Sequence, residues 1–159
     1  MTPSLSTTAN VVVRPPVLFL AAVLLGQTLD RVSPLMWPPR AGDAFCWIAG
    51  GTLILGGLAI ARAGIRDFSR AGTPVPTNQP TSALVTNGMH GWSRNPIYVG
   101  MLLLYAGIGI AARSPWILIL GLPLVIVMRT IVVAREEAYL ERRFGDAYRD
   151  YKARVRRWL

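Results

Sequence analysis

Four apolar blocks alternate with polar segments along this chain. They cover residues 16–29, 44–63, 96–112 and 115–134. A helix that crosses a bilayer needs about 17–25 residues of this kind. The last three blocks meet this length, and the first reaches it by extending toward Val11 or through Asp30–Val32. The pattern therefore predicts four transmembrane helices.

The first block differs from a cleaved signal peptide. Only Arg14 stands ahead of it as a positive charge, and no small-residue cleavage site follows. A secretory signal needs both features. We therefore expect the block to be retained as a membrane helix.

Positive charges collect on alternate connections. Arg62, Arg66, Arg70 and Arg94 flank or lie in the segment after the second block, and eight Lys or Arg residues follow from Arg135 onward. The other two connections carry few. Because cytoplasmic loops are enriched in Lys and Arg, we expect both termini and the central segment on the cytoplasmic side.

The chain divides into three parts by this pattern. Residues 1–63 form a predicted N-terminal helical hairpin, residues 64–95 a long Pro/Thr/Asn-rich cytoplasmic loop, and residues 96–159 a second hairpin with a tail. A loop of this length is usually functional or disordered, and we expect a lid over a site. Pro115 suits a helix start, and Pro123 predicts a kink inside the fourth helix.

The tail has helical periodicity. Its apolar residues recur every three or four positions, at Leu140, Phe144, Tyr148, Tyr151, Val155 and Trp158. This spacing predicts an amphipathic helix, on the membrane surface or packed beneath the bundle. Gly145 followed by Asp146 indicates a helix end and a new N-cap.

Two adjacent acids lie where the last span meets the interface. On the same helical wheel Glu137 falls on the apolar side and Glu136 at its edge, and Arg129 lies one or two turns earlier on the same side. Acids at this depth are costly unless they are paired or used. They indicate either a ligand-binding carboxylate or general base, or an ion pair with Arg129 or Arg135.

Composition supports a membrane protein. The chain is 52% apolar and 16% charged, with mean hydropathy +0.40 and net charge +9. Soluble domains carry about 25% charged residues, so a water-soluble globule and a disordered chain are both unfavourable interpretations. The basic charge fits nucleic acid or an anionic membrane surface, and the apolar blocks favour the membrane. One cysteine and one histidine exclude an intrachain disulfide and make a metal site or Ser–His catalysis unfavourable.

The third block has a distinctive start. Asn95 is placed as an N-cap and Pro96 as the first helical residue, with Arg94 directly before them. A helix N-terminus with an adjacent arginine is suited to an anion. Ordinary capping explains the Asn-Pro pair equally well.

Two ordered motifs make the chain recognisable. LVTNG…RNPIYVG, an apolar hairpin and EEAYLERRFGDAYRDYKARV follow one another from about Gly72 to Trp158. This arrangement resembles the isoprenylcysteine carboxyl methyltransferase and phospholipid methyltransferase superfamily of integral membrane proteins. The resemblance implies an all-α membrane bundle that moves a methyl group from S-adenosylmethionine (SAM) to a lipid-like acceptor, such as an isoprenylcysteine-type carboxylate, in a bacterial cytoplasmic membrane.

The resemblance also implies site residues. The implied cofactor-binding residues are Gly88, His90, Arg94, Asn95, Pro96, Tyr98, Gly100, Glu136 and Glu137, and the implied catalytic residues are Glu137 and Arg154. The sequence departs from the family at Asn95, where prenylcysteine methyltransferases have histidine, and at His90-Gly91, which replaces an aromatic–Arg pair.

The chemistry of these residues suits SAM. Its carboxylate fits Arg94 and the helix start, and a glutamate suits its amino group or ribose. Trp92, Tyr98 and His90 are candidate partners for the adenine ring or the sulfonium, and Arg154 suits an anionic acceptor. Expected partners are membrane lipids and the hydrophobic acceptor, without metal or nucleic acid. An NADPH-dependent membrane reductase and a non-catalytic membrane scaffold are the alternatives.

Overall fold

The computed structural model describes residues 14–38, 42–75 and 80–159, and within them it contains helices and no strands. The elements are α1 (Pro15–Val32), α2 (Asp43–Arg70), the 3-10 turn η1 (Gly88–Gly91), α3 (Pro96–Ala111), α4 (Pro115–Val127), the π turn η2 (Met128–Val132), α5 (Val133–Phe144) and α6 (Asp146–Arg154). The all-α prediction is confirmed. The suggested extension of the first helix toward Val11 lies outside the described residues.

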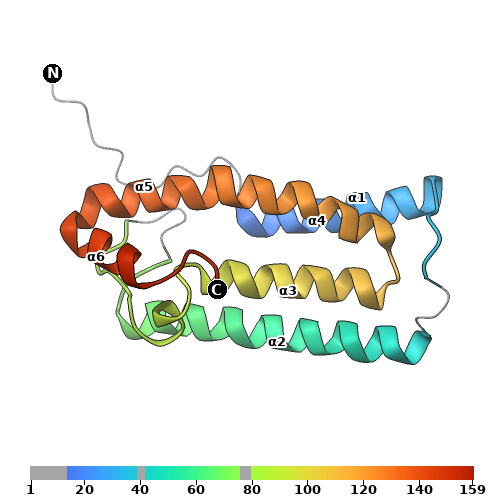
Figure 1. Ribbon diagram of the computed structural model, residues 1–159, viewed down its shortest axis with the longest axis horizontal. Coiled ribbons are helices and arrows are strands. Elements are labelled where there is room, and N and C mark those ends of the chain that lie inside the picture. Colours follow the sequence, from blue (N-terminus) through green and yellow to red (C-terminus); the bar gives the residue numbers. More distant parts are fainter. Residues whose placement is uncertain (1–13, 39–41, 76–79) are drawn as a thin grey trace, which may run out of the picture.

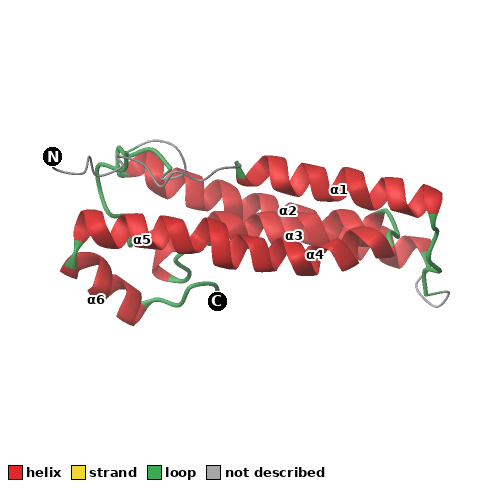
Figure 2. Cartoon of the chain, turned by 90° about the horizontal axis from the view of Figure 1, so that it is seen from above, coloured by secondary structure: helices red, strands yellow, loops and turns green. Residues whose placement is uncertain are grey.

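Four rods lie side by side along the long axis of the molecule. α2 packs along α3, and α1 packs against α4, while α4, η2 and α5 form one continuous rod (Figures 1 and 2). At one end α6 folds back below α5, and the segment after it runs to the start of α3 (Figure 1). This end of the bundle holds the motif residues.

Prolines begin three of the helices. Pro15, Pro96 and Pro115 are each the first helical residue, a position where the missing N–H costs nothing. Ser114 caps α4 by accepting a hydrogen bond from the Ile117 N–H at 3.0 Å. The predicted start at Pro115 and the tight hairpin between α3 and α4 are confirmed.

Small residues bring α2 and α3 together. A Cβ at Gly57 would lie 2.5 Å from the Gly100 carbonyl oxygen, and one at Gly100 would lie 2.5 Å from the Gly57 carbonyl oxygen. Gly50 and Gly107 meet in the same reciprocal way, at 2.7 and 2.6 Å. Backbone contact of this kind is typical of membrane helix pairs. Gly100 therefore contributes to helix packing.

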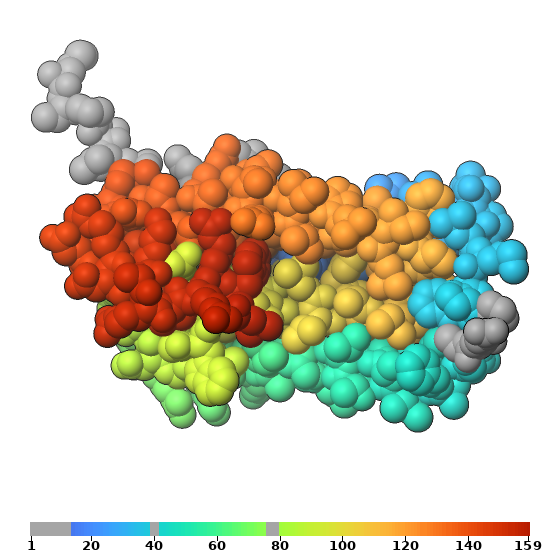
Figure 3. Space-filling model, viewed as in Figure 1, coloured from blue at the N-terminus to red at the C-terminus, as the bar shows by residue number. Residues whose placement is uncertain are grey.

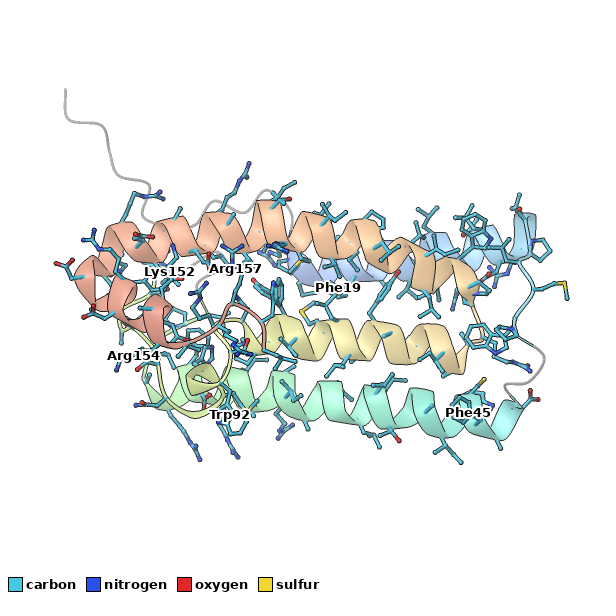
Figure 4. All side chains as sticks on the ribbon, in the orientation of Figure 1. Phe19, Phe45, Trp92, Lys152, Arg154 and Arg157 are labelled. Atoms are coloured by element: carbon cyan, nitrogen blue, oxygen red, sulfur yellow. The ribbon has the colours of Figure 1, made fainter. Side chains whose placement is uncertain are left out.

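The outer surface of the rods is apolar. Large side chains that are about half exposed or more cover α1, α2 and α4, among them Leu20, Leu24, Phe45, Trp47, Ile48, Leu55, Leu122 and Ile126 (Figure 4). An apolar surface this extensive requires a non-aqueous partner. The protein is integral to a membrane.

The number of spans differs from the prediction. Three helices of the described chain are long and apolar enough to cross a membrane: Pro15–Val32, Asp43–Arg70 and Pro115–Phe144. α3 has 16 residues, about 24 Å at 1.5 Å per residue, against a hydrocarbon core of about 30 Å. The predicted four-span count is therefore not confirmed.

A π turn interrupts the last rod. Met128–Val132 adopts π geometry between α4 and α5, beyond Pro123, which lies inside α4. A π turn holds one residue more than an α turn. The buried side of the rod therefore passes from Met128 to Val133 and then to the two glutamates. Arg129 is exposed. The prediction that it shares a side with Glu137 was wrong, because the wheel assumed an unbroken α-helix.

Two boundaries also differ from the sequence pattern. α2 continues to Arg70 rather than Ala63, so the central loop begins later than residue 64. The predicted helix end at Gly145 is confirmed: this residue, at φ 54°, ends α5 and caps α6, so the tail is two helices. Asp146 is the first residue of α6 instead of the predicted cap. α6 is only 9 residues long and ends at Arg154. The single amphipathic C-terminal helix is not confirmed.

Candidate functional site

A cavity lies at the end of the bundle where α2, the 81–98 segment, α5 and α6 meet. Its wall is formed by Phe68, Val75, Thr81, Ala83, Leu84, Val85, His90, Arg94, Asn95, Pro96, Ile97, Tyr98, Glu136, Glu137, Leu140, Tyr148 and Tyr151. One part of this wall is apolar and the other is rich in ionisable groups.

Glu137 is held by two arginines. Its Oε1 accepts from Arg94 Nη2 at 2.8 Å and from Arg157 Nε at 3.2 Å, and its Oε2 accepts from Arg157 Nη2. The Glu137 and Arg94 side chains are 7% and 9% exposed, and that of Arg157 is 32% exposed. The arginines that hold Glu137 are thus Arg94, just before α3, and Arg157, in the tail, rather than the predicted Arg129 or Arg135.

Glu136 faces the same cavity through a different contact. It is 5% exposed, and its Oε1 accepts a hydrogen bond from the Tyr98 hydroxyl at 2.6 Å. Tyr98 lies in the first turn of α3. Both glutamates are thus tied to the start of α3, Glu136 through Tyr98 and Glu137 through Arg94.

The segment after α6 completes this arrangement. The Arg94 N–H donates to the Arg156 carbonyl at 2.9 Å, and Asn95 Nδ2 donates to the Arg157 carbonyl at 2.9 Å. Val155 has extended backbone, which turns the chain out of the helix and along the 93–95 segment. In the space-filling view the red C-terminal residues lie against the yellow-green segment that precedes α3 (Figure 3). In Figure 4 Arg157 lies between α5 and the start of α3.

Asn95 therefore does not act as predicted. It occupies the N-cap position of α3, but its side chain makes no capping hydrogen bond and reaches the tail instead. Pro96 begins the helix as expected. The Asn95 side chain joins the helix start to the tail rather than satisfying the first turn.

Asp67 organises the other side of the cavity. Its Oδ2 accepts the Met89 N–H at 2.8 Å and lies 3.3 Å from His90 Nδ1. Gly88 has φ 65°, and a Cβ there would lie 2.4 Å from Asp67 Oδ1. The η1 turn is wrapped around this carboxylate, and only glycine fits at residue 88.

Part of the central loop covers the cavity. Thr81, Ala83, Leu84 and Val85 form wall, and the Thr81 N–H donates to the Tyr139 hydroxyl at 3.2 Å. Residues 76–79 of the predicted lid lie outside the described residues. The loop therefore serves as one wall of the cavity.

Burial changes the acidity of three groups around the cavity. It lowers the pKa of His90 below 6.5, against the opposing effect of Asp67. Burial also raises the pKa of Tyr148 and of Tyr151 above the ordinary value. All three side chains are therefore neutral at pH 7.

Comparison with known proteins gives the family. The model of the phospholipid methyltransferase family matches residues 45–147, which is more than half of the chain. The chain belongs to the phospholipid methyltransferase family. This confirms the resemblance found in the motifs.

Two curated relatives were also found. An uncharacterised protein of Haemophilus influenzae is 57% identical over 35 residues, which cover 22% of this chain and 56% of the relative. The lamin-B receptor of Drosophila melanogaster is 32% identical over 80 residues, 49% of this chain and 11% of the relative. The chain thus spans about half of the first relative and a tenth of the second. No solved structure matches the chain.

The structure brings most of the residues implied by the family together. His90, Arg94, Asn95, Pro96, Tyr98, Glu136 and Glu137 all line the cavity. Gly88 and Gly100 lie outside its wall, where they support η1 and the α2–α3 contact.

Two further candidates lie away from the cavity. Arg154 is exposed, and its Nε donates to the Asp150 carbonyl on the outer side of α6 (Figure 4). Trp92 is 79% exposed and does not line the cavity, so it is no ring partner there. Both positions were assigned by motif alignment or aromatic character, and neither signal reports which way a side chain turns.

Three residues near the cavity were missed by the sequence reasoning. Arg157 was passed over because the family motif pointed to Arg154, and nothing in the motif indicates that the chain leaves the helix at Val155. Asp67 was hidden inside a predicted loop. Thr81 carried no signal, since a threonine in a polar loop is unremarkable by composition.

Proposed function

We propose that this protein is an integral membrane methyltransferase that transfers a methyl group from SAM to a lipid-like acceptor. The observation that carries the proposal is the cavity at the start of α3, where Glu136, Glu137 and Arg94 converge in a member of the phospholipid methyltransferase family. When bound, SAM supplies a methyl group activated by a sulfonium.

The charges around the cavity suit a cationic ligand. Glu136 and Glu137 line the cavity together with Arg94. Carboxyl groups in a partly dehydrated site favour a positively charged ligand.

Two buried polar atoms at the cavity wall provide hydrogen-bonding groups for a ligand. Arg94 Nε and Thr81 Oγ1 are buried without a hydrogen-bond partner among the described residues, and both residues line the cavity. Buried polar atoms are nearly always paired. Arg94 Nε suits the carboxylate of SAM, next to the N–H groups that the first turn of α3 leaves without intrahelical acceptors. Thr81 Oγ1 suits a hydroxyl or an amino group.

Glu136 and Glu137 have different roles in this proposal. Both oxygens of Glu137 accept from arginines, so Glu137 holds Arg94 and Arg157 in place. Glu136, on the cavity wall with Tyr98, is the acid that faces the amino group or ribose. Arg157, rather than the Arg154 implied by the family motif, is the tail arginine that contacts Glu137.

The apolar wall suits the acceptor. Phe68, Leu84, Val85, Ile97 and Leu140 form an apolar surface next to the ionisable one. A methyl transfer needs donor and acceptor held in line and water excluded, and positioning alone can supply about 7–11 kcal/mol of the barrier. The site would face the cytoplasm, following the Lys and Arg distribution.

Equilibrium binding to the purified protein in lipid nanodiscs tests the proposal. Binding of SAM but not NADPH supports it. Binding of NADPH alone would replace it with a reductase, and binding of neither with a scaffold. Transfer of radiolabelled methyl from SAM into fractionated lipid extracts then identifies the acceptor.

A further inference from the structure

His90 is held from several sides at the cavity wall. It is 4% exposed, its Nδ1 faces Asp67 Oδ2 at 3.3 Å, and the Phe68 ring meets it edge-on at 4.7 Å. The Tyr151 hydroxyl donates to its carbonyl oxygen at 2.6 Å. Ring and backbone are both fixed, which is more than packing of a small loop requires.

The Asp67 contact decides where the proton of the ring sits. An ionised carboxylate only accepts hydrogen bonds, so it selects the neutral form with the proton on Nδ1. The lone pair is then on Nε2. An acid–histidine pair that fixes the tautomer in this way is the arrangement that prepares a histidine to accept a proton.

The surrounding groups are compatible with a neutral ring. Asp67 faces it from α2, and Tyr151 contacts it from α6. Arg94 lines the same cavity from the segment just before α3, and the two glutamates line it from α5. Burial outweighs the effect of Asp67 and lowers the pKa of His90, so Nε2 is unprotonated at pH 7.

We propose that His90 Nε2 accepts the proton of the methyl acceptor, with Asp67 as its positioning residue, and that the acceptor is therefore an amine or a thiol. This inference rests on the proposed methyltransferase function. A carboxylate acceptor is already ionised at pH 7, so it has no proton for a histidine base to accept.

The proton and electrons balance in this step. The acceptor's N–H or S–H bond breaks, and its proton forms a bond to Nε2, which becomes an imidazolium. The freed lone pair forms the new bond to the methyl carbon, while the methyl–sulfur bond of the donor breaks and leaves its electron pair on sulfur as a thioether. The imidazolium afterwards returns its proton to solvent.

The single histidine makes the tautomer measurable. The chain contains one His, so the ¹⁵N spectrum of untagged protein labelled at histidine reports on His90 alone. At pH 7 we expect the neutral form protonated at Nδ1. Asp67→Asn should lose this preference, whereas Asp43→Asn, the same change at the opposite end of α2, should leave it intact. A wild-type ring protonated at Nε2, or on both nitrogens, would overturn the inference.

Turnover tests the role. The acceptors are vesicles carrying a primary-amine phospholipid, a long-chain alkanethiol or a long-chain fatty acid. We expect transfer to the amine or the thiol, with an acid limb below pH 6.5. His90→Phe should lower kcat by about 100-fold or more and remove that limb, while a cooperative thermal transition followed by tryptophan fluorescence shows that the variant is folded.

The outcomes separate the two proposals. SAM binding with transfer to the fatty acid alone or to none of the three acceptors, or an unchanged kcat in His90→Phe, refutes the base and leaves the cofactor assignment standing. Absence of SAM binding in wild type refutes the proposed function, and the acceptor inference with it.

Discussion

Replacing Glu137 by glutamine tests the charge cluster at the cavity. The substitution keeps the size of the side chain and removes the negative charge that Arg94 and Arg157 share. Removing one partner of a buried ion pair costs about 3–5 kcal/mol. Arg157 is 32% exposed and can turn to solvent, so most of the cost comes from Arg94, and we expect about 3 kcal/mol.

This loss is measurable as a change in thermal stability. For a chain of this size 1 kcal/mol corresponds to about 2–4 °C, so Glu137→Gln should lower Tm by about 6–12 °C in nanodiscs, followed by tryptophan fluorescence. Glu141→Gln is the matched control on the same helix. Its partner Lys152 is 3.3 Å away, and both side chains are about 40% exposed, so the control should cost under about 1 kcal/mol.

The cofactor affinity is measured on the same variants. We expect Glu137→Gln to weaken SAM binding at least tenfold, because Arg94 loses its fixed position, and Glu141→Gln to leave it unchanged. Equal Tm values for the two variants would refute the buried cluster. An unchanged affinity in Glu137→Gln would refute its role in holding Arg94 for the ligand.

Three further changes test other parts of the structure. Gly57→Leu should destabilise the α2–α3 contact by about 1–3 kcal/mol, whereas Gly56→Leu, which meets nothing within 4 Å, should not; equal Tm values would contradict the packing. Because burial lowers the pKa of His90 below 6.5, the unfolded chain binds more protons in acid. The stability from neutral His90 is therefore fully present above pH 6.5 and lost as pH falls through the folded pKa. His90→Phe should reduce the pH dependence of the free energy of unfolding, and an unchanged pH dependence would show that other groups cause it. Deleting Thr130 should convert the π turn to an α turn and keep SAM affinity within about tenfold, because both cavity glutamates retain their face. Deleting Leu103 rotates one half of α3 relative to the other by about 100° and should abolish SAM binding. A larger loss of SAM affinity on deleting Thr130 than on deleting Leu103 would contradict the π-turn assignment.

The sequence predicted the features that depend on local rules. Pro96 and Pro115 begin helices because proline suits the first position, and Gly145 ends one because its φ is positive. The acidic pair was placed at the cavity because charged groups at an interface need partners. These arguments use a residue and its near neighbours along one helix.

These local arguments could not predict the contacts between segments that are distant in the sequence. Helical phase cannot be carried across a π turn, so Arg129 was paired with Glu137 in place of Arg94. The family motif selected Arg154 over Arg157, because a motif does not record that the backbone becomes extended at Val155. The Asp67–His90 contact joins the end of α2 to a turn more than 20 residues later, and no periodicity records it.

Residues 155–157 follow α1 to α6 in the order of synthesis, yet they supply the carbonyl groups and the guanidinium that contact Arg94, Asn95 and Glu137. A nascent chain that has inserted α1, α2 and α3 thus holds Arg94 and Asn95 without these partners. Assembly of the charged part of the cavity wall is consequently a late event in the biogenesis of this protein.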